Sequence, residues 1–102
     1  MKRVKQIRWL PEAREDVAAI VEFISADSLR SAERLIDQID RLVSLLEHFP
    51  YLGAISPLAK RARMLIEGNY VIYYTVHRTK IVVRAVVHGA MLTKRGRLRL
   101  DK

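Results

Sequence analysis

The chain contains no cysteine among its 102 residues. A disulfide framework, a thiolate metal site and a cysteine nucleophile are therefore excluded. The sequence also lacks the metal-binding patterns HxH and HExxH, a carboxylate cluster at metal-ligand spacing, and the phosphate-binding patterns GxxxxGK[ST] and GxGxxG. We expect neither a metal nor a cofactor, so any chemistry has to come from histidine, tyrosine, arginine, lysine or carboxylate side chains.

Long apolar runs are missing as well. A membrane helix needs about 18 to 20 consecutive apolar residues, and the apolar runs of this chain extend over only a few. The opening stretch, MKRVKQIRWLPEAR, carries the charges of a signal peptide's first region, but no apolar block follows it. The pattern favours a cytoplasmic protein without a membrane segment, and the length favours a single domain over residues 1–102.

Acidic residues are scarce at both ends of the chain. Residues 1–11 carry a net charge of +4 and residues 48–102 carry +9, whereas residues 12–47 carry −5. The net charge of +8 therefore comes from the two ends. This asymmetry favours an anionic partner, either nucleic acid or an acidic protein segment. The chain shows no aromatic stacking motif and no recognition-helix pattern, which makes a simple nucleic-acid binder the weaker interpretation.

The middle of the chain has the periodicity of two amphipathic helices. Pro11 suits the first position of a helix, because its fixed φ and missing N–H cost nothing there. Apolar residues then recur at helical spacing as far as Ile24. SADS at residues 25–28 supplies turn and capping residues, and a second apolar stripe runs from near Ser28 to about His48. Two helices with so short a connection should form an antiparallel hairpin.

The remaining patterns are those of strands and loops. Residues 3–9 alternate weakly and precede a proline, which indicates a short strand. Residues 50–60 contain proline, glycine and serine and indicate a loop. Three further strands are predicted, with hairpin-length links, at residues 61–66, 70–77 and 80–87. The fold class is therefore α+β: a short N-terminal strand, an antiparallel two-helix hairpin, a three-stranded antiparallel meander and a basic C-terminal segment at residues 89–102.

Alternation along each strand sorts the side chains onto two faces. The more apolar positions are expected to meet the helices: Ala62, Met64 and Ile66; Tyr70, Ile72, Tyr74 and Val76; and Ile81, Val83, Ala85 and Val87. The other face would display three arginines, a phenol and an imidazole: Arg61, Arg63, Tyr73, Arg84 and His88. His77 stands at the margin of this set. Cations, a phenol and an imidazole on one surface form a candidate functional site.

Several short patterns, taken together, resemble the RelE/ParE superfamily of bacterial type II toxins. They are the stretch from Trp9 to Ala13, the helical hairpin, HFPYLG at residues 48–53, Arg63-x-Leu65, Tyr70-x-Ile72-x-Tyr74 and Val86-Val87-His88-Gly89. The resemblance covers residues 7–89 and is spread over the chain. It implies a toxin with this α+β fold, and a cognate antitoxin whose disordered, acidic, amphipathic segment folds onto the toxin and neutralises it.

Two activities occur in that superfamily. RelE-like members cut mRNA in the ribosome, with a set of residues that here would be Arg61, Arg63, Arg84 and His88. ParE-like members inhibit DNA gyrase by binding. RelE-like nucleases with such a histidine usually have an arginine directly after the position of Tyr70, where this chain has Val71. They also have an aromatic residue where this chain has Gly89. The resemblance favours a ParE-like inhibitor that is not an enzyme, with a RelE-like mRNA endoribonuclease as the alternative.

Target contacts would come from the sheet and from the basic C-terminal segment. ParE-like members often continue with arginines soon after the histidine, whereas here GAML precedes KRGRLR. The expected target-binding residues are Arg63, Tyr73, Arg84, His88, Lys94, Arg95, Arg97 and Arg99. A third interpretation stays open, in which the chain is an inactive module that only binds an antitoxin or nucleic acid.

Overall fold

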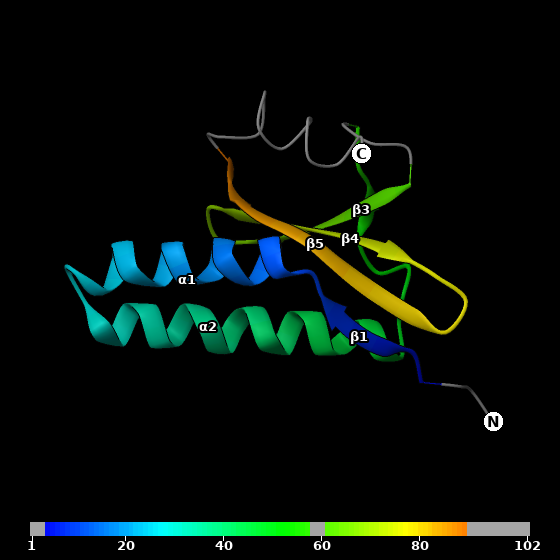
Figure 1. Ribbon diagram of the computed structural model, residues 1–102, viewed down its shortest axis with the longest axis horizontal. Coiled ribbons are helices and arrows are strands. Elements are labelled where there is room, and N and C mark those ends of the chain that lie inside the picture. The colour runs from blue at the N-terminus through cyan, green and yellow to red at the C-terminus, as the bar shows by residue number, and fades with distance from the viewer. Residues whose placement is uncertain (1–3, 58–60, 90–102) are drawn as a thin grey trace.

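The computed structural model of the protein describes residues 4–57 and 61–89. They form two layers, a five-stranded sheet and a pair of helices that cover one of its faces (Figure 1). The elements in chain order are β1 (Gln6–Trp9), α1 (Pro11–Ser25), α2 (Leu29–Ser44), the short 3-10 helix η1 (Leu45–Glu47), β2 (Ala54–Ile55), β3 (Ala62–Glu67), β4 (Tyr70–Val76) and β5 (Lys80–His88). The predicted α+β class and element order are confirmed.

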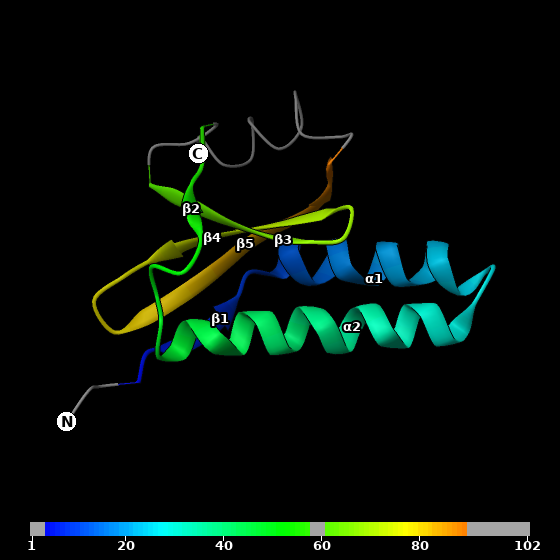
Figure 2. The same ribbon diagram turned by 180° about the vertical axis from the view of Figure 1, so that it is seen from behind.

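Both helices begin and end close to the predicted positions. Pro11 is the first residue of α1, where its missing N–H leaves no intrahelical bond unmade. The Ser28 side chain caps α2 by accepting a hydrogen bond from the backbone N–H of Ser31 at 3.1 Å. The last turn of the predicted second helix tightens into η1, which ends one residue before His48. The two helices lie side by side beneath the sheet in both ribbon views (Figures 1 and 2).

The strand order of the sheet is β1-β5-β4-β3-β2. The antiparallel meander of β3, β4 and β5 agrees with the prediction. β1 adds to it in parallel, with Gln6 opposite Lys80 and Trp9 opposite Val83, so the sheet is mixed. The segment predicted as a loop at residues 50–60 contains the two-residue strand β2, which pairs antiparallel with β3 at the other edge (Figure 2).

The main core lies between the helices and the sheet. Its buried members come from both helices, η1 and the three long strands: Ala13, Leu35, Ile39, Val43, Leu46, Leu65, Ile72, Tyr74, Ile81, Val83 and Val86. A polar contact also joins the two layers, because Asp16 of α1 accepts a hydrogen bond from the backbone N–H of Val86 at 2.9 Å. That N–H belongs to the part of β5 beyond its pairing with β1, so α1 supplies the acceptor that a neighbouring strand would otherwise provide.

The side-chain directions on β3 are the reverse of the prediction. Leu65 packs in the main core, whereas Ala62 and Met64 belong to a smaller apolar cluster on the sheet face away from the helices, the outer face. Residues directly opposite each other share a face, and Met64 lies opposite Tyr73 of that cluster. Because the outer face has an apolar cluster of its own, apolar residues on β3 do not mark the helix side. On β4 the prediction is confirmed, with Ile72 and Tyr74 inward and Val71 and Tyr73 outward.

A bulge in β5 overturns the prediction for the second half of that strand. Tyr73 lies opposite Ala85 but Tyr74 lies opposite Val83, so Arg84 is an extra residue on β5. An extra residue inverts the alternation beyond it. Ala85 and Val87, which were predicted to meet the helices, therefore lie in the outer cluster. Val86, which was predicted to point outward, packs in the main core.

Candidate functional site: a pinned loop and a cationic patch

Arg63 does not lie on the outer face where the sequence placed it. It is opposite Tyr74 across β3 and β4 and shares the helix-side face. Its Nη1 donates hydrogen bonds to the carbonyl oxygen of Gly53 at 2.8 Å and to that of Tyr51 at 3.4 Å. The guanidinium carbon lies 4.9 Å from the centre of the Tyr51 ring, within cation–π range. Arg63 therefore holds the loop that follows η1.

Tyr74 holds the same loop from inside the protein. Its side chain is buried, and its hydroxyl accepts a hydrogen bond from the backbone N–H of Gly53 at 2.8 Å. A Cβ on residue 53 would lie 2.6 Å from the carbonyl oxygen of Met64 and 2.8 Å from the Tyr74 hydroxyl, so only glycine fits there. Burial raises the pKa of the Tyr74 phenol, and the Gly53 hydrogen bond and the Arg63 charge oppose that rise only in part. Tyr74 is thus a neutral structural group at physiological pH.

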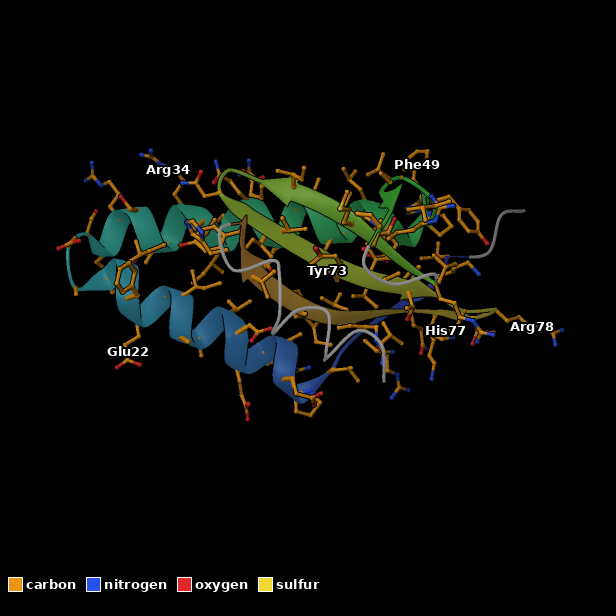
Figure 3. All side chains as sticks on the ribbon, turned by 90° about the horizontal axis from the view of Figure 1, so that it is seen from above. Glu22, Arg34, Phe49, Tyr73, His77 and Arg78 are labelled. Carbon is orange, nitrogen blue, oxygen red and sulfur yellow. The ribbon has the colours of Figure 1, made fainter. Side chains whose placement is uncertain are left out.

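Large apolar side chains are exposed on η1, on the loop held by Arg63 and Tyr74, and on β2, and we term this group the loop patch: Leu45, Phe49, Tyr51, Leu52 and Ile55, each between 46% and 64% exposed. Five of the nine large apolar residues that are exposed among residues 4–57 and 61–89 therefore fall within eleven consecutive positions. Figure 3 shows Phe49 pointing outward near one end of the molecule. Apolar side chains gathered in this way are typical of a protein interaction surface.

A second group of residues gathers where β4 turns into β5. The Thr75 hydroxyl lies 2.8 Å from Nε2 of His77, and the backbone N–H of His77 donates to the carbonyl oxygen of Lys80 at 2.8 Å. Thr75 and His77 alternate with Tyr74 and Val76 and so project onto the outer face. We term the cations grouped around His77, together with His77 itself, the cationic patch: Arg61, His77, Lys80 and Arg84.

Positive charges dominate the surroundings of His77. Its pKa is lowered from the ordinary value of 6.5, first by partial burial and then by the charges of Lys80, Arg84 and Arg61. The five strands contain a single carboxylate, Glu67, and it lies at the opposite end of β4, across from Tyr70. The arrangement concentrates charge of one sign at one end of the sheet.

His88 and Tyr73 lie outside this patch. His88 is opposite Tyr70 on the helix side of the sheet, and the two rings make an edge contact with centroids 5.3 Å apart. Tyr73 projects outward as predicted, but it is only 1% exposed and burial raises the pKa of its phenol. The four predicted nuclease residues are therefore not assembled: Arg61 and Arg84 are near His77, whereas Arg63 and His88 are on the other face.

Sequence reasoning missed the centre of the patch. It chose His88 and left His77 at the margin, and it did not include Thr75 or Lys80. The available signal was the spacing Thr75-x-His77, which places a hydroxyl and an imidazole on the same side of a strand. The predicted target-binding residues of the basic C-terminal segment lie outside the described residues: Lys94, Arg95, Arg97 and Arg99.

Other surface features of the described residues are few. A shallow pocket of about 330 Å³ lies at the junction of β1 with the two helices and is lined by Trp9, Arg14, Val17, Ile36, Ile39 and Asp40. Residues 4–57 and 61–89 contain no cluster of three histidine or carboxylate side chains that could hold a metal ion. None of the described helices is long and apolar enough to cross a membrane.

Comparison with known proteins places the chain in a family. It matches the family model described as the ParE toxin of the type II toxin–antitoxin system, parDE, over residues 7–93. No curated protein sequence matches it. Among solved structures it is similar to a chain of the chromosomal ParDE TA system from P. aeruginosa, with a TM-score of 0.73 and 17% sequence identity over 85% of this chain and 98% of that chain. The family match spans most of the chain, and this protein belongs to the ParE toxin family of type II toxin–antitoxin systems.

Proposed function

We propose that this toxin binds DNA gyrase and inhibits it without covalent chemistry of its own. The observation that carries the proposal is the separation of the residues that an mRNA-cutting site would need. Arg63 is held by two backbone carbonyls of the loop, and His88 lies on the opposite face from His77. A general acid–base pair has to reach the same scissile phosphate, and these two residues do not share a surface with Arg84.

The loop patch supports binding as the mode of action. Aromatic and large aliphatic anchors contribute most of the free energy at protein interfaces. Arg63 and Tyr74 hydrogen-bond the backbone of the patch at Tyr51 and Gly53, and a preorganised surface loses little conformational entropy when a partner docks. We therefore assign the loop patch to the contact with gyrase.

We further propose that a cognate antitoxin neutralises the toxin through an acidic, amphipathic segment. The family is named for a toxin–antitoxin system, and residues 48–102 carry a net charge of +9. An acidic segment that folds on binding would match that charge and cover apolar surface at the same time.

The test uses purified toxin without antitoxin in two parallel reactions. One is a gyrase supercoiling reaction, and the other contains translating ribosomes with end-labelled mRNA. We expect blocked supercoiling or trapped cleaved DNA, with the mRNA intact. Codon-spaced mRNA cuts with normal gyrase activity would overturn the proposal and assign a nuclease site to Arg61, His77 and Arg84. No effect in either reaction would indicate an inactive binding module.

Variants of the loop patch test where gyrase binds. Phe49→Ala and Leu52→Ala remove exposed side chains, so the fold should persist. Together they should weaken gyrase inhibition at least about tenfold, because truncating two anchors typically costs this much. Phe23→Ala is the matched control, since Phe23 is 76% exposed on α1. An equal loss of gyrase inhibition with the control variant would show that the loop patch is not the surface that binds gyrase.

A further inference from the structure

The pocket at the junction of β1 with the two helices has an apolar floor. In Figure 1, β1 leads directly into α1, which lies alongside α2. The pocket has a volume of about 330 Å³, and its apolar lining comes from all three elements: Trp9, Val17, Ile36 and Ile39. Ile39 is 2% exposed and the other three are half-buried, so part of their apolar surface stays open to a ligand.

Two opposite charges complete the lining of this pocket. Arg14 of α1 and Asp40 of α2 are both exposed. Within residues 4–57 and 61–89, neither side chain forms a hydrogen bond or an ion pair, with the other or with any third group. Their own helices offer no partner, because the positions three and four residues away hold no opposite charge. An unpaired guanidinium and an unpaired carboxylate therefore border one apolar floor.

This combination of groups selects a ligand by its charge. Asp40 would repel a simple anion, and Arg14 would repel a simple cation. A neutral apolar ligand would cover both charged groups without pairing either, which costs free energy. One carboxylate is too few for a metal ion, which takes several oxygen ligands. A ligand that satisfies every group carries a carboxylate, an ammonium group and an apolar part.

We propose that this pocket binds a free apolar α-amino acid of the leucine type. The carboxylate of the ligand accepts hydrogen bonds from the Arg14 guanidinium, and its ammonium group donates to the Asp40 carboxylate. Its side chain packs on the apolar floor. Ligand pockets span about 300–1,000 Å³, so a pocket near the lower limit suits a ligand with a single side chain.

A peptide fits this arrangement less well than a free amino acid. A residue inside a peptide has neither backbone charge, and a terminal residue has only one of the two. The acidic antitoxin segment is also a poor occupant, because residues 12–47 carry a net charge of −5 and would repel it. The competing occupant is a protein helix that presents glutamate, leucine and lysine side chains at helical spacing.

The test begins with four ligands added to the 102-residue chain. Proton–nitrogen NMR correlation spectra follow titrations with L-leucine, N-acetyl-leucine, leucinamide and glycine. The last three lack, in that order, the ammonium group, the carboxylate and the side chain. L-Leucine should shift the backbone resonances of the pocket residues with a millimolar dissociation constant. Each of the other ligands should bind at least about fivefold more weakly, because each loses one of the three contacts.

Two variants connect each charge of the ligand with one side chain. Arg14→Gln should weaken L-leucine binding at least about fivefold and leave leucinamide binding unchanged, because leucinamide has no carboxylate to lose. Asp40→Asn should weaken L-leucine binding to a similar extent and leave N-acetyl-leucine binding unchanged.

The matched controls make the same two substitutions elsewhere on α2. They are Arg34→Gln and Asp37→Asn, at exposed positions outside the pocket lining. Figure 3 shows the Arg34 side chain pointing outward from α2. Each control should change the dissociation constant of L-leucine less than about twofold, because surface substitutions away from a site have small effects.

Three outcomes would overturn the proposal. L-Leucine could shift no pocket resonance up to its solubility limit, or it could bind no more tightly than N-acetyl-leucine and leucinamide. Alternatively, a capped helical peptide with glutamate, leucine and lysine could bind more tightly than L-leucine, which would assign the pocket to a protein helix. The comparison of the four ligands needs no variant, so it tests the proposal even if a variant does not fold. The proposal involves neither gyrase nor the antitoxin, so it stands or falls separately from the proposed function.

Discussion

The pinned loop and the cationic patch use arginine in opposite ways. Arg63 on β3 donates to two backbone carbonyls and lies against the Tyr51 ring, so its charge stabilises the fold. Arg84 on β5 lies near His77 instead, and its charge helps to lower the pKa of that ring. Only β4 separates the two strands. The role of an arginine in this sheet therefore follows from its partners and cannot be read from its residue type.

The strongest way to break the pinned loop, while leaving the cationic patch unchanged, is Gly53→Ala. The added Cβ would meet the carbonyl oxygen of Met64 at 2.6 Å, and a backbone atom cannot easily move away. We expect a loss of about 3 kcal/mol in the free energy of unfolding, measured by urea denaturation. Gly89→Ala is the control, because its Cβ would meet only the Asn69 carbonyl oxygen, at 3.4 Å. Equal stability of the two variants would contradict the steric account of the loop.

Tyr74→Phe tests the inner contact of the loop. It leaves the buried N–H of Gly53 without its acceptor, and an unsatisfied buried donor costs about 2 kcal/mol. Tyr73→Phe removes a phenol that is buried to a similar extent on the opposite face, and it should cost less. The midpoints of urea denaturation compare the two variants. A larger loss of stability for Tyr73→Phe than for Tyr74→Phe would contradict the role of the Tyr74 hydroxyl as acceptor for Gly53.

A third pair of variants separates the two arginine roles directly. Arg63→Gln removes the charged donor to Gly53 and the contact with the Tyr51 ring, and should lower stability by about 1 kcal/mol. Arg61→Gln is at an exposed position and should change stability by less than about 0.5 kcal/mol. For the pKa of His77 the order should reverse, with Arg61→Gln raising that pKa, in an NMR titration, more than Arg63→Gln, because Arg61 is one of the charges that lower it. The same order in both measurements would contradict the different roles assigned to Arg63 and Arg61.

The smallest effect concerns acid sensitivity. The pKa of His77 is lowered in the folded protein, mainly by burial and further by Lys80, Arg84 and Arg61. Below pH 6.5 the unfolded chain therefore takes up a proton at His77 that the folded chain does not yet bind. Stability should fall as the pH decreases from 6.5 through the lowered pKa. His77→Gln should reduce this decline, measured as the difference between urea midpoints at pH 7.5 and pH 5.5. An unchanged difference would mean that the pKa of His77 is not lowered in the folded protein.

The helices and the meander could be predicted because their signals are local. Pro11 and Ser28 mark where the helices begin, and the alternation of β4 correctly placed Tyr74 inward and Tyr73 outward. The two-residue strand β2 is too short to show a period. The parallel pairing of β1 with β5 joins residues more than seventy positions apart, and no local pattern carries that information.

The candidate site was predicted less well than the fold, for two physical reasons. Both faces of the sheet are apolar near the centre, so the alternation of β3 fits either direction, and Arg63 was placed on the wrong face. The bulge at Arg84 then inverted the rest of β5, which moved His88 away from the outer face. Neither the apolar outer cluster nor the extra residue leaves a mark in a single sequence. Arg61 and Arg84 both lie near His77, and not near His88 as the sequence had predicted.

The parallel pairing of β1 with β5 also determines when the toxin can finish folding. Among the described strands β1 is synthesised first, and its partner residues, Lys80 to Val83, belong to β5, which is synthesised after the other four. Contacts between distant parts of a chain form late, and domains fold as their residues emerge during translation. The side chains of Ile7 and Trp9 can therefore pack against the main core only after β5 has formed. A nascent chain that stops short of Val83 cannot complete the sheet, so the finished toxin surface arises only after β5 has been synthesised.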